Sequence, residues 1–234
     1  MSELIDRWNA VKQRISKCAV AANRKVDDVS LLAVSKTRPA EMIRELAGAG
    51  QVEFGENYVQ EAVDKIQSLQ DLDLIWHFIG PLQSNKTRLV ADNFDWVHSV
   101  DRIKIAQRLN EQRPAGKPPL NVLIQVNISD ESSKSGVQVS DLDALAQVIM
   151  DAPALVLKGL MAIPVAETDP VLQRTVFARL RQIRDALTLK LGIPLPILSM
   201  GMSGDMEAAI EEGASYVRIG TDIFGPRDYS QTSR

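Results

Sequence analysis

The chain has 234 residues, of which 45% are hydrophobic and 24% charged, the composition of an ordinary soluble globular protein. No uninterrupted apolar stretch is long enough to cross a bilayer, and a formal net charge of −3 gives no overall attraction for nucleic acid. Residues 1–7 lack the basic start and apolar centre of a secretory signal. We therefore predict a cytoplasmic protein that binds neither membrane nor nucleic acid.

Cysteine and histidine are rare in the chain, which argues against disulfide bonds and metal sites. Cys18 is the only cysteine, so the chain has neither an intramolecular disulfide nor a cysteine-based zinc site. It shares a helical face with Val11 and Ile15, and we interpret it as a packed core thiol. His77 and His98 are the only histidines and do not have the spacing of metal ligands. We predict no metal site.

Short apolar runs alternate with longer amphipathic ones along the whole chain, which is the pattern of βα units. In chain order the predicted elements are a helix at 3–22, a strand at 30–35, a helix at 39–50, a strand at 52–55, a helix at 57–69, a strand at 74–79, a helix at 85–91, a strand at 96–99, a helix at 101–112, a strand at 120–127, a helix after residue 140, a strand at 159–163, a helix at 170–191, a strand at 195–200, a helix at 203–212 and a strand at 216–219. The largely apolar run at 120–127 indicates a strand buried on both faces, as in a parallel sheet.

About eight strands is the number of a (β/α)8 barrel. The same alternation is also compatible with an open doubly wound sheet, but no Gly-x-Gly-x-x-Gly follows the first strand, which favours the barrel. No low-complexity stretch interrupts the chain. We predict α/β architecture: a single (β/α)8 TIM barrel domain over residues 1–234, with an extra N-terminal helix.

Lys36 closes the apolar run at 29–35 and is followed at once by a helix-start signature, Thr37-Arg38-Pro39. A lysine at the end of a strand is held at a rigid, partly buried place, where desolvation favours the uncharged amine that forms Schiff bases. Taken alone, a surface lysine whose stem packs on the protein explains the position equally well. Lys158 precedes the strand at 159–163, which places it at the opposite rim of a barrel.

Two small-residue loops follow the last two strands. Residues 199–205 open a helix after strand seven, and residues 220–225 follow strand eight. In barrels the loops after these two strands commonly form a phosphate site. Ser203 alone could be a helix N-cap, and Gly220 alone could serve a turn. Both loops at the required strand ends favour phosphate binding.

Arg218 lies inside the apolar strand at 216–219, where an unpaired charge is costly on either face. Alternation places it on one face with Tyr216 and Gly220, and it needs a partner whether that face points into the barrel or towards the helices. Asn57 follows the strand at 52–55, where it either caps the next helix or points its amide into the site.

Five segments are specific enough to indicate a family: Ala33-Val34-Ser35-Lys36-Thr37, Phe54-Gly55-Glu56-Asn57-Tyr58, His77-Phe78-Ile79-Gly80-Pro81-Leu82-Gln83-Ser84-Asn85-Lys86, Leu198-Ser199-Met200-Gly201-Met202-Ser203 and Val217-Arg218-Ile219-Gly220-Thr221. They resemble the pyridoxal phosphate homeostasis protein family, the YggS/PROSC-type proteins, over nearly the full chain. That family is in turn similar to the barrel domain of bacterial alanine racemase, which implies a fold-type III barrel that binds pyridoxal 5′-phosphate (PLP).

The resemblance also implies roles for individual residues. Lys36 would hold PLP as an internal aldimine, Ser203, Gly220 and Thr221 would bind its phosphate, Arg218 would face the pyridine nitrogen, and Asn57 would lie beside the ring. Met200 completes the expected cofactor-binding set, and we expect no catalytic residue.

An arginine at the ring nitrogen disfavours a pyridinium, and an unprotonated ring is a poor electron sink, so carbanion chemistry should be slow. Racemisation also needs a second acid or base, which fold-type III racemases take from a dimer with a second domain, and we expect this chain to have no such domain. The expected function is therefore intracellular PLP (vitamin B6) homeostasis, in which the protein carries or buffers the cofactor with little or no turnover.

Alternative functions remain open on the sequence. One is a PLP-dependent amino-acid racemase or decarboxylase with Tyr58 or His77 as the extra base, and another is a Lys-dependent aldolase acting on sugar phosphates. We further expect a monomer, with PLP-dependent enzymes as recipients of the cofactor. The polar loop at 129–136 is the place where we expect a conformational switch.

Overall fold

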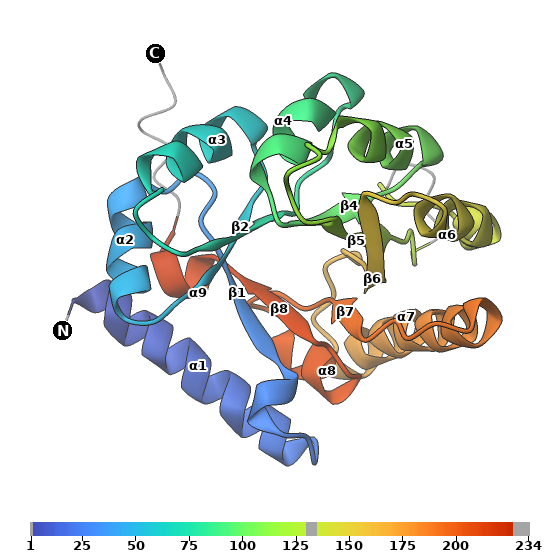
Figure 1. The fold of residues 1–234 in the computed structure, drawn as a ribbon. Helices are drawn as coiled ribbons and strands as arrows, with labels where there is room; N and C mark the ends of the chain where they lie inside the picture. The colour runs from blue at the N-terminus through green and yellow to red at the C-terminus, as the bar shows by residue number, and fades with distance from the viewer. Residues whose placement is uncertain (1, 130–134, 227–234) are drawn as a thin grey trace.

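The computed structural model describes residues 2–129 and 135–226, in which eight parallel strands close into a barrel (Figure 1). The strands are β1 (Ser30–Val34), β2 (Glu53–Glu56), β3 (Ile75–Phe78), β4 (Trp96–Val100), β5 (Leu120–Gln125), β6 (Leu155–Met161), β7 (Ile197–Ser199) and β8 (Tyr216–Ile219). Each strand pairs in parallel with the next along the chain, and β8 pairs back onto β1. The predicted (β/α)8 barrel is confirmed, and the open doubly wound sheet is wrong.

Helices surround the ring of strands (Figure 1). They are α1 (Glu3–Ala21), α2 (Ala40–Gly48), α3 (Val59–Ser68), α4 (Thr87–Asn93), α5 (Ile103–Gln112), α6 (Leu142–Met150), α7 (Pro170–Leu191), α8 (Met206–Glu211) and α9 (Thr221–Phe224). Local signals set their ends, as α7 illustrates: the Asp169 side chain accepts a hydrogen bond from Val171 N, and Gly192 leaves the helix in the left-handed conformation, with φ of 67°.

Strand six differs from its prediction because it begins at Leu155, four residues before the predicted start at 159. Half-buried Lys158 interrupts its apolar pattern. The register against β5 passes from Leu157 directly to Gly159, so Lys158 is an extra residue in the middle of the strand. Its predicted place at the opposite rim is therefore wrong.

The extra helix α1 is amphipathic and packs against α8 and α9. Ser2 caps its start by accepting a hydrogen bond from Ile5 N at 3.3 Å, and an apolar stripe that includes Leu4, Trp8 and Ile15 is buried in the core. Cys18 is half-buried beside this core, and burial raises the pKa of its thiol. The helix therefore packs on the outside of the barrel, beside α8 and α9 (Figure 1).

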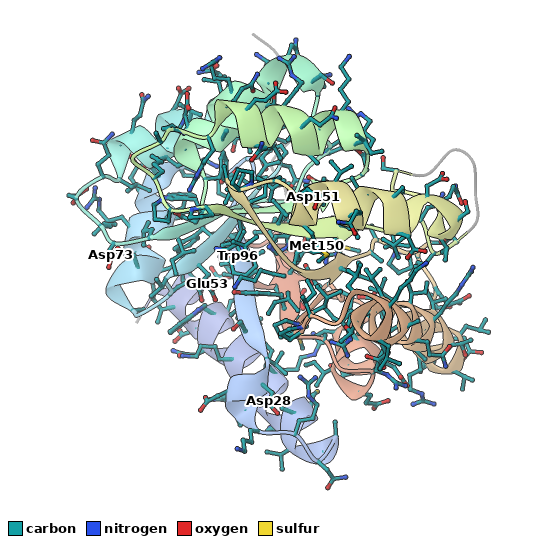
Figure 2. All side chains as sticks on the ribbon, turned by 45° about the vertical axis from the view of Figure 1, so that its right-hand side comes forward. Asp28, Glu53, Asp73, Trp96, Met150 and Asp151 are labelled. Atoms are coloured by element: carbon teal, nitrogen blue, oxygen red, sulfur yellow. The ribbon has the colours of Figure 1, made fainter. Side chains whose placement is uncertain are left out.

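The barrel interior contains a polar cluster beneath a small apolar layer. Leu32, Val34, Ile79 and Tyr216 form the apolar layer. His77 stacks on Trp96, with ring centroids 5.4 Å apart, and Glu53 lies 3.5 Å from His77 Nε2 (Figure 2 labels Glu53 and Trp96). His77 and His98 are both fully buried, so neither can exchange its hydrogen bonds with water.

None of the helices in the described ranges is long and apolar enough to cross a membrane. The same residues include no group of three or more His, Cys, Asp or Glu side chains that could hold a metal ion. The loop at 129–136, in which a switch was predicted, lies mostly outside the described residues, since 130–134 are not described.

The two buried histidines predict an acid-dependent stability. Burial lowers the pKa of His77 and of His98 from the ordinary value of 6.5, so both stay neutral in the folded protein while the unfolded chain takes up a proton at each. Because the unfolded state binds more protons, the free energy of unfolding should fall as the pH drops from about 6.5 towards 5. Urea unfolding across this range measures the linkage. His98→Gln should reduce the number of protons taken up on unfolding by about one. If the pH dependence of the free energy of unfolding stays the same in this variant, His98 is not one of the groups responsible.

Candidate functional site

A cavity of about 260 Å³ opens where the carboxyl ends of the strands meet. Its lining includes six of the seven predicted cofactor-binding residues, namely Lys36, Asn57, Ser203, Arg218, Gly220 and Thr221. They follow or end strands β1, β2, β7 and β8, which are far apart in the sequence. The closed barrel brings these strand ends to one rim, which is where barrel proteins place their binding sites.

Lys36 is half-buried and leaves β1 through a strained turn. Thr37, the next residue, has φ of 60°, a left-handed conformation that is unfavourable for a β-branched residue. Two hydrogen bonds hold it there: Thr37 N donates to Glu61 Oε1 at 2.6 Å, and Thr37 Oγ1 donates to the carbonyl of Lys36, also at 2.6 Å. The direction in which the chain leaves β1 is therefore fixed by a contact from α3.

A buried ion pair supports this turn from below. Lys65 Nζ donates to Glu56 Oε1 and to the carbonyl of Ser35, each at 2.7 Å, and also to Glu61 Oε1 at 2.5 Å. Ser35 Oγ donates to the same Glu56 oxygen at 2.6 Å. Burial raises the pKa of Glu56, and the Lys65 ammonium opposes that rise. Lys65 thus ties the end of β1, the end of β2 and the start of α3 together.

The two small-residue loops meet on the other side of the cavity. Ser203 and Gly204 come from the loop after β7, while Gly220 and Thr221 form the start of α9. Gly201 has φ of 92°, and a Cβ there would lie 2.5 Å from the Cβ of Ala209, so only glycine suits this bend. Hydroxyl groups and the first backbone N–H groups of a helical turn are ready donors to an anion.

Arg14 of α1 holds both loops from outside the barrel. Its Nη2 donates to the carbonyl of Ser203 at 3.1 Å, and its Nη1 pairs with Asp222 at 3.0 Å. It also pairs with Glu207 on α8, which raises the pKa of the guanidinium. One side chain from the extra helix thereby fixes the spacing between the loop after β7 and the loop after β8.

Arg218 faces into the barrel, which settles the orientation that the sequence left open. It is 4% exposed, and its Nη1 donates to Ser199 Oγ at 2.9 Å and its Nη2 to the carbonyl of Ala162 at 3.0 Å. Burial lowers its pKa to about 10, with Asp205 opposing the shift, so the guanidinium is cationic at neutral pH. A buried positive charge therefore forms part of the cavity wall.

Asn57 also lines the cavity, and its Oδ1 is buried with no hydrogen-bond partner. It does not cap the next helix, because α3 begins at Val59 after Tyr58 and has no side-chain cap. Gly80 approaches Asn57 so closely that a Cβ there would lie 2.2 Å from the Asn57 carbonyl oxygen. An acceptor held in this way, and left without a partner, is typical of a site that contributes a hydrogen bond to a ligand.

Met200 is the one predicted cofactor-binding residue that is absent from the described lining. It is fully buried in the hydrophobic core, whereas Met202, two residues further on, is exposed and lines the cavity. The sequence analysis missed Arg38 and Ile163, which also line it. Ile163 follows the end of β6 by two residues and Arg38 follows the end of β1 by four, and these positions near strand ends could have identified them.

The two residues considered as an extra base lie elsewhere. Tyr58 is 53% exposed, and His77 is fully buried with His98 as its neighbour. Neither belongs to the described lining of the cavity.

The fold and the cavity define a class: a (β/α)8 barrel with a lysine after the first strand and small-residue loops after the last two. The family described as alanine racemase, N-terminal domain, matches residues 4–228. A pyridoxal phosphate homeostasis protein of Pseudomonas aeruginosa is 57% identical, covering 98% of each chain, and one of Escherichia coli is 55% identical, covering 99% of this chain and all of the other. The chain belongs to the pyridoxal phosphate homeostasis protein family.

Solved structures agree with this assignment. PipY of Synechococcus elongatus, determined with PLP bound, is 37% identical, has a TM-score of 0.81 and covers 90% of this chain and 100% of its own. Alanine racemase of Corynebacterium glutamicum is 18% identical with a TM-score of 0.70, covering 94% of this chain and 62% of its own. The second likeness shows that the two proteins share the barrel fold.

The ion pair beneath Lys36 can be tested by removing one partner. Lys65→Met leaves Glu56 buried beside no cation, and the free energy of unfolding should fall by about 3–5 kcal/mol. Adding Glu56→Gln should restore part of this loss, because the second change removes the uncompensated charge. Urea unfolding measures both, with Lys17→Met on the exposed side of α1 as the control. Equal stability of Lys65→Met and the control would contradict the account.

Proposed function

We propose that this protein binds PLP in the cavity at the carboxyl ends of the strands and carries or buffers it, with little or no catalytic turnover. The observation that carries the proposal is one cavity that combines Lys36, the two small-residue loops, the buried cation of Arg218 and the unpartnered oxygen of Asn57. These groups match the aldehyde, the phosphate and the ring of PLP. PLP binding by PipY, whose chain is 37% identical, supports the same conclusion.

Each of these residues has a definite task in the proposal. When bound, PLP supplies an aldehyde that condenses with an amine and a ring that can accept electrons. Lys36 supplies the amine, and the turn at Thr37 fixes where that amine can reach. Ser203 and Thr221 donate to the phosphate, with Gly220 allowing the backbone to approach closely. Arg218 would present its cation to the ring nitrogen, and Asn57 would lie beside the ring.

Low turnover follows from the proton-transfer groups in the cavity wall. The titratable side chains in its described lining are Lys36, Arg38 and Arg218, with no carboxylate, histidine or tyrosine among them. Arg218 keeps its proton at neutral pH and so does not protonate the ring nitrogen. A racemase or decarboxylase with Tyr58 or His77 as the base is disfavoured, since neither lines the cavity in the described chain.

The setting of this function is also part of the proposal. We place the protein in the cytoplasm as a monomer, with PLP-dependent enzymes as recipients of the cofactor. The names of the curated relatives, pyridoxal phosphate homeostasis proteins, support a role in supply rather than in a reaction of its own.

Titration of the cofactor-free protein with PLP and with pyridoxal, followed by visible absorption, tests the proposal. Two or more charge-assisted hydrogen bonds to the phosphate should make PLP bind about 100-fold more tightly than pyridoxal. Incubation of the loaded protein with L- and D-alanine should give no steady turnover. Turnover abolished by Tyr58→Phe would identify an enzyme, and borohydride trapping of a sugar phosphate without PLP would identify an aldolase.

Arg14 provides a separate test of the phosphate loops. Arg14→Gln removes the guanidinium that joins the two loops, so the affinity for PLP should fall about tenfold while that for pyridoxal stays the same. Arg44→Gln, which breaks a surface pair with Asp71 and a 3.4 Å hydrogen bond to the carbonyl of Ser68, both away from the cavity, is the matched control. Equal weakening of both ligands by Arg14→Gln would show that Arg14 acts on the whole barrel and not on the phosphate loops.

A further inference from the structure

A continuous chain of polar groups runs through the barrel from Arg218 to Glu53. Arg218 Nη1 donates to Ser199 Oγ, and Ser199 Oγ lies 2.9 Å from His98 Nδ1. His98 Nε2 lies 3.0 Å from His77 Nδ1, and His77 Nε2 lies 3.5 Å from Glu53 Oε1. Every contact in the chain is between side chains on the inner face of the barrel, from strands β2, β3, β4, β7 and β8.

The two ends of this chain carry opposite charges. Burial raises the pKa of Glu53, but the imidazole of His77 at 3.5 Å and the hydrogen bond from Tyr216 outweigh it, so the net pKa lies below its ordinary value and Glu53 is a carboxylate. Tyr216 OH donates to Glu53 Oε1 at 2.5 Å and, beside this carboxylate and away from water, its own pKa is raised. Arg218 is the cation at the other end.

Charge at the two ends fixes the direction of the hydrogen bonds between them. The Ser199 hydroxyl accepts a hydrogen bond from Arg218, and its own O–H remains available to donate. Ser199 therefore donates a hydrogen bond to His98 Nδ1. His98 then carries its proton on Nε2 and donates to His77 Nδ1, which leaves His77 with its proton on Nε2, facing Glu53. In this arrangement Ser199 and His98 each accept on the Arg218 side and donate on the Glu53 side, and His77 accepts from His98 and turns its Nε2 proton towards Glu53, 3.5 Å away.

The reverse direction is unfavourable at both ends. His77 would then turn an unprotonated Nε2 towards the Glu53 carboxylate, and two acceptors would face each other in a buried place. Ser199 would accept from both Arg218 and His98, leaving its own hydroxyl proton with no acceptor in the chain. A doubly protonated imidazole is excluded by burial, which lowers the pKa of both histidines.

We propose that Ser199, His98, His77 and Glu53 are positioning residues for Arg218, acting as one polarised relay in which both imidazoles are neutral and carry their proton on Nε2. The inference rests on the proposed function for its consequence: the relay would hold the guanidinium in place in the cavity wall and couple it to a carboxylate that it does not touch. The charged and titratable groups that face the two imidazoles are Glu53, Asp95, Tyr216 and Arg218.

The relay makes a prediction that a merely structural histidine pair does not. The chain has only two histidines, so long-range proton–nitrogen correlation spectra of the nitrogen-15-labelled, cofactor-free protein contain two imidazole systems. At pH 7 both should show a protonated Nε2 and an unprotonated Nδ1. A protonated Nδ1 on either ring, or an imidazolium, would overturn the proposal.

Ser199→Ala tests the link between the relay and the cavity. It removes the acceptor of Arg218 Nη1 and the donor to His98 Nδ1, so the nitrogen shift of His98 Nδ1 should move to that of a nitrogen without a hydrogen bond. The affinity for PLP should fall about tenfold, because a buried guanidinium N–H loses its acceptor. Ser30→Ala makes the same chemical change on β1, outside the relay, and should alter neither reading. A Ser199→Ala protein that keeps both the His98 shift and the affinity of the wild type would overturn the proposal.

The imidazole spectra and the affinity for PLP test the relay and the proposed function separately. The spectra are recorded without cofactor. A protein that shows the expected tautomers but does not bind PLP would contradict the proposed function and support the relay. PLP binding with the wrong tautomers would do the opposite. A folded far-ultraviolet spectrum for each variant excludes unfolding as the cause of a lost reading.

Discussion

The buried charge of Arg218 is the constraint on which the rest of the site depends. A cation that is 4% exposed must find acceptors inside the barrel, and it finds the Ser199 hydroxyl and the Ala162 carbonyl at the ends of two other strands. Those contacts fix the guanidinium at the wall of the cavity, where it stays cationic at neutral pH. In the proposed function such a cation would favour binding over carbanion chemistry, because it would not give its proton to a bound ring.

On the other side of the cavity, the ion pairs of the buried Lys65 side chain hold the strained turn at Thr37 in place. The left-handed Thr37 turn would relax without the Glu61 contact, and Lys65 in turn holds Glu61 in reach of Thr37 N. The extra helix α1 holds the loops after β7 and β8 in the same way, through Arg14. In each case a charged side chain from a helix fixes a loop at a strand end, so the cavity is shaped before any ligand arrives.

Most of the fold and of the cavity could be predicted from the sequence, because each strand of the barrel pairs with the next one along the chain and all strand ends meet at one rim. Hydrophobic alternation located the eight strands, and their ends located Lys36, Ser203 and Gly220 at one rim. The start of β6 at Leu155 was missed, because Lys158 interrupts the apolar run and is the extra residue of the strand. Strand periodicity could not reveal the contact of His77 with His98, since it depends on the stagger of two strands. It also could not reveal the contact of Lys65 with Glu56, since Lys65 lies on a helix and the contact depends on how α3 packs against the strand ends.

Reduction with borohydride followed by peptide mapping tests the central claim most directly, because it reports which amine holds the cofactor. Protein equilibrated with one equivalent of PLP and reduced at neutral pH should carry a single pyridoxyl group on the peptide that contains Lys36. The chain offers other lysines as internal controls, including Lys158 in the middle of β6 and Lys65 in its buried ion pair. No adduct at all, or an adduct on another lysine in place of Lys36, would contradict the account.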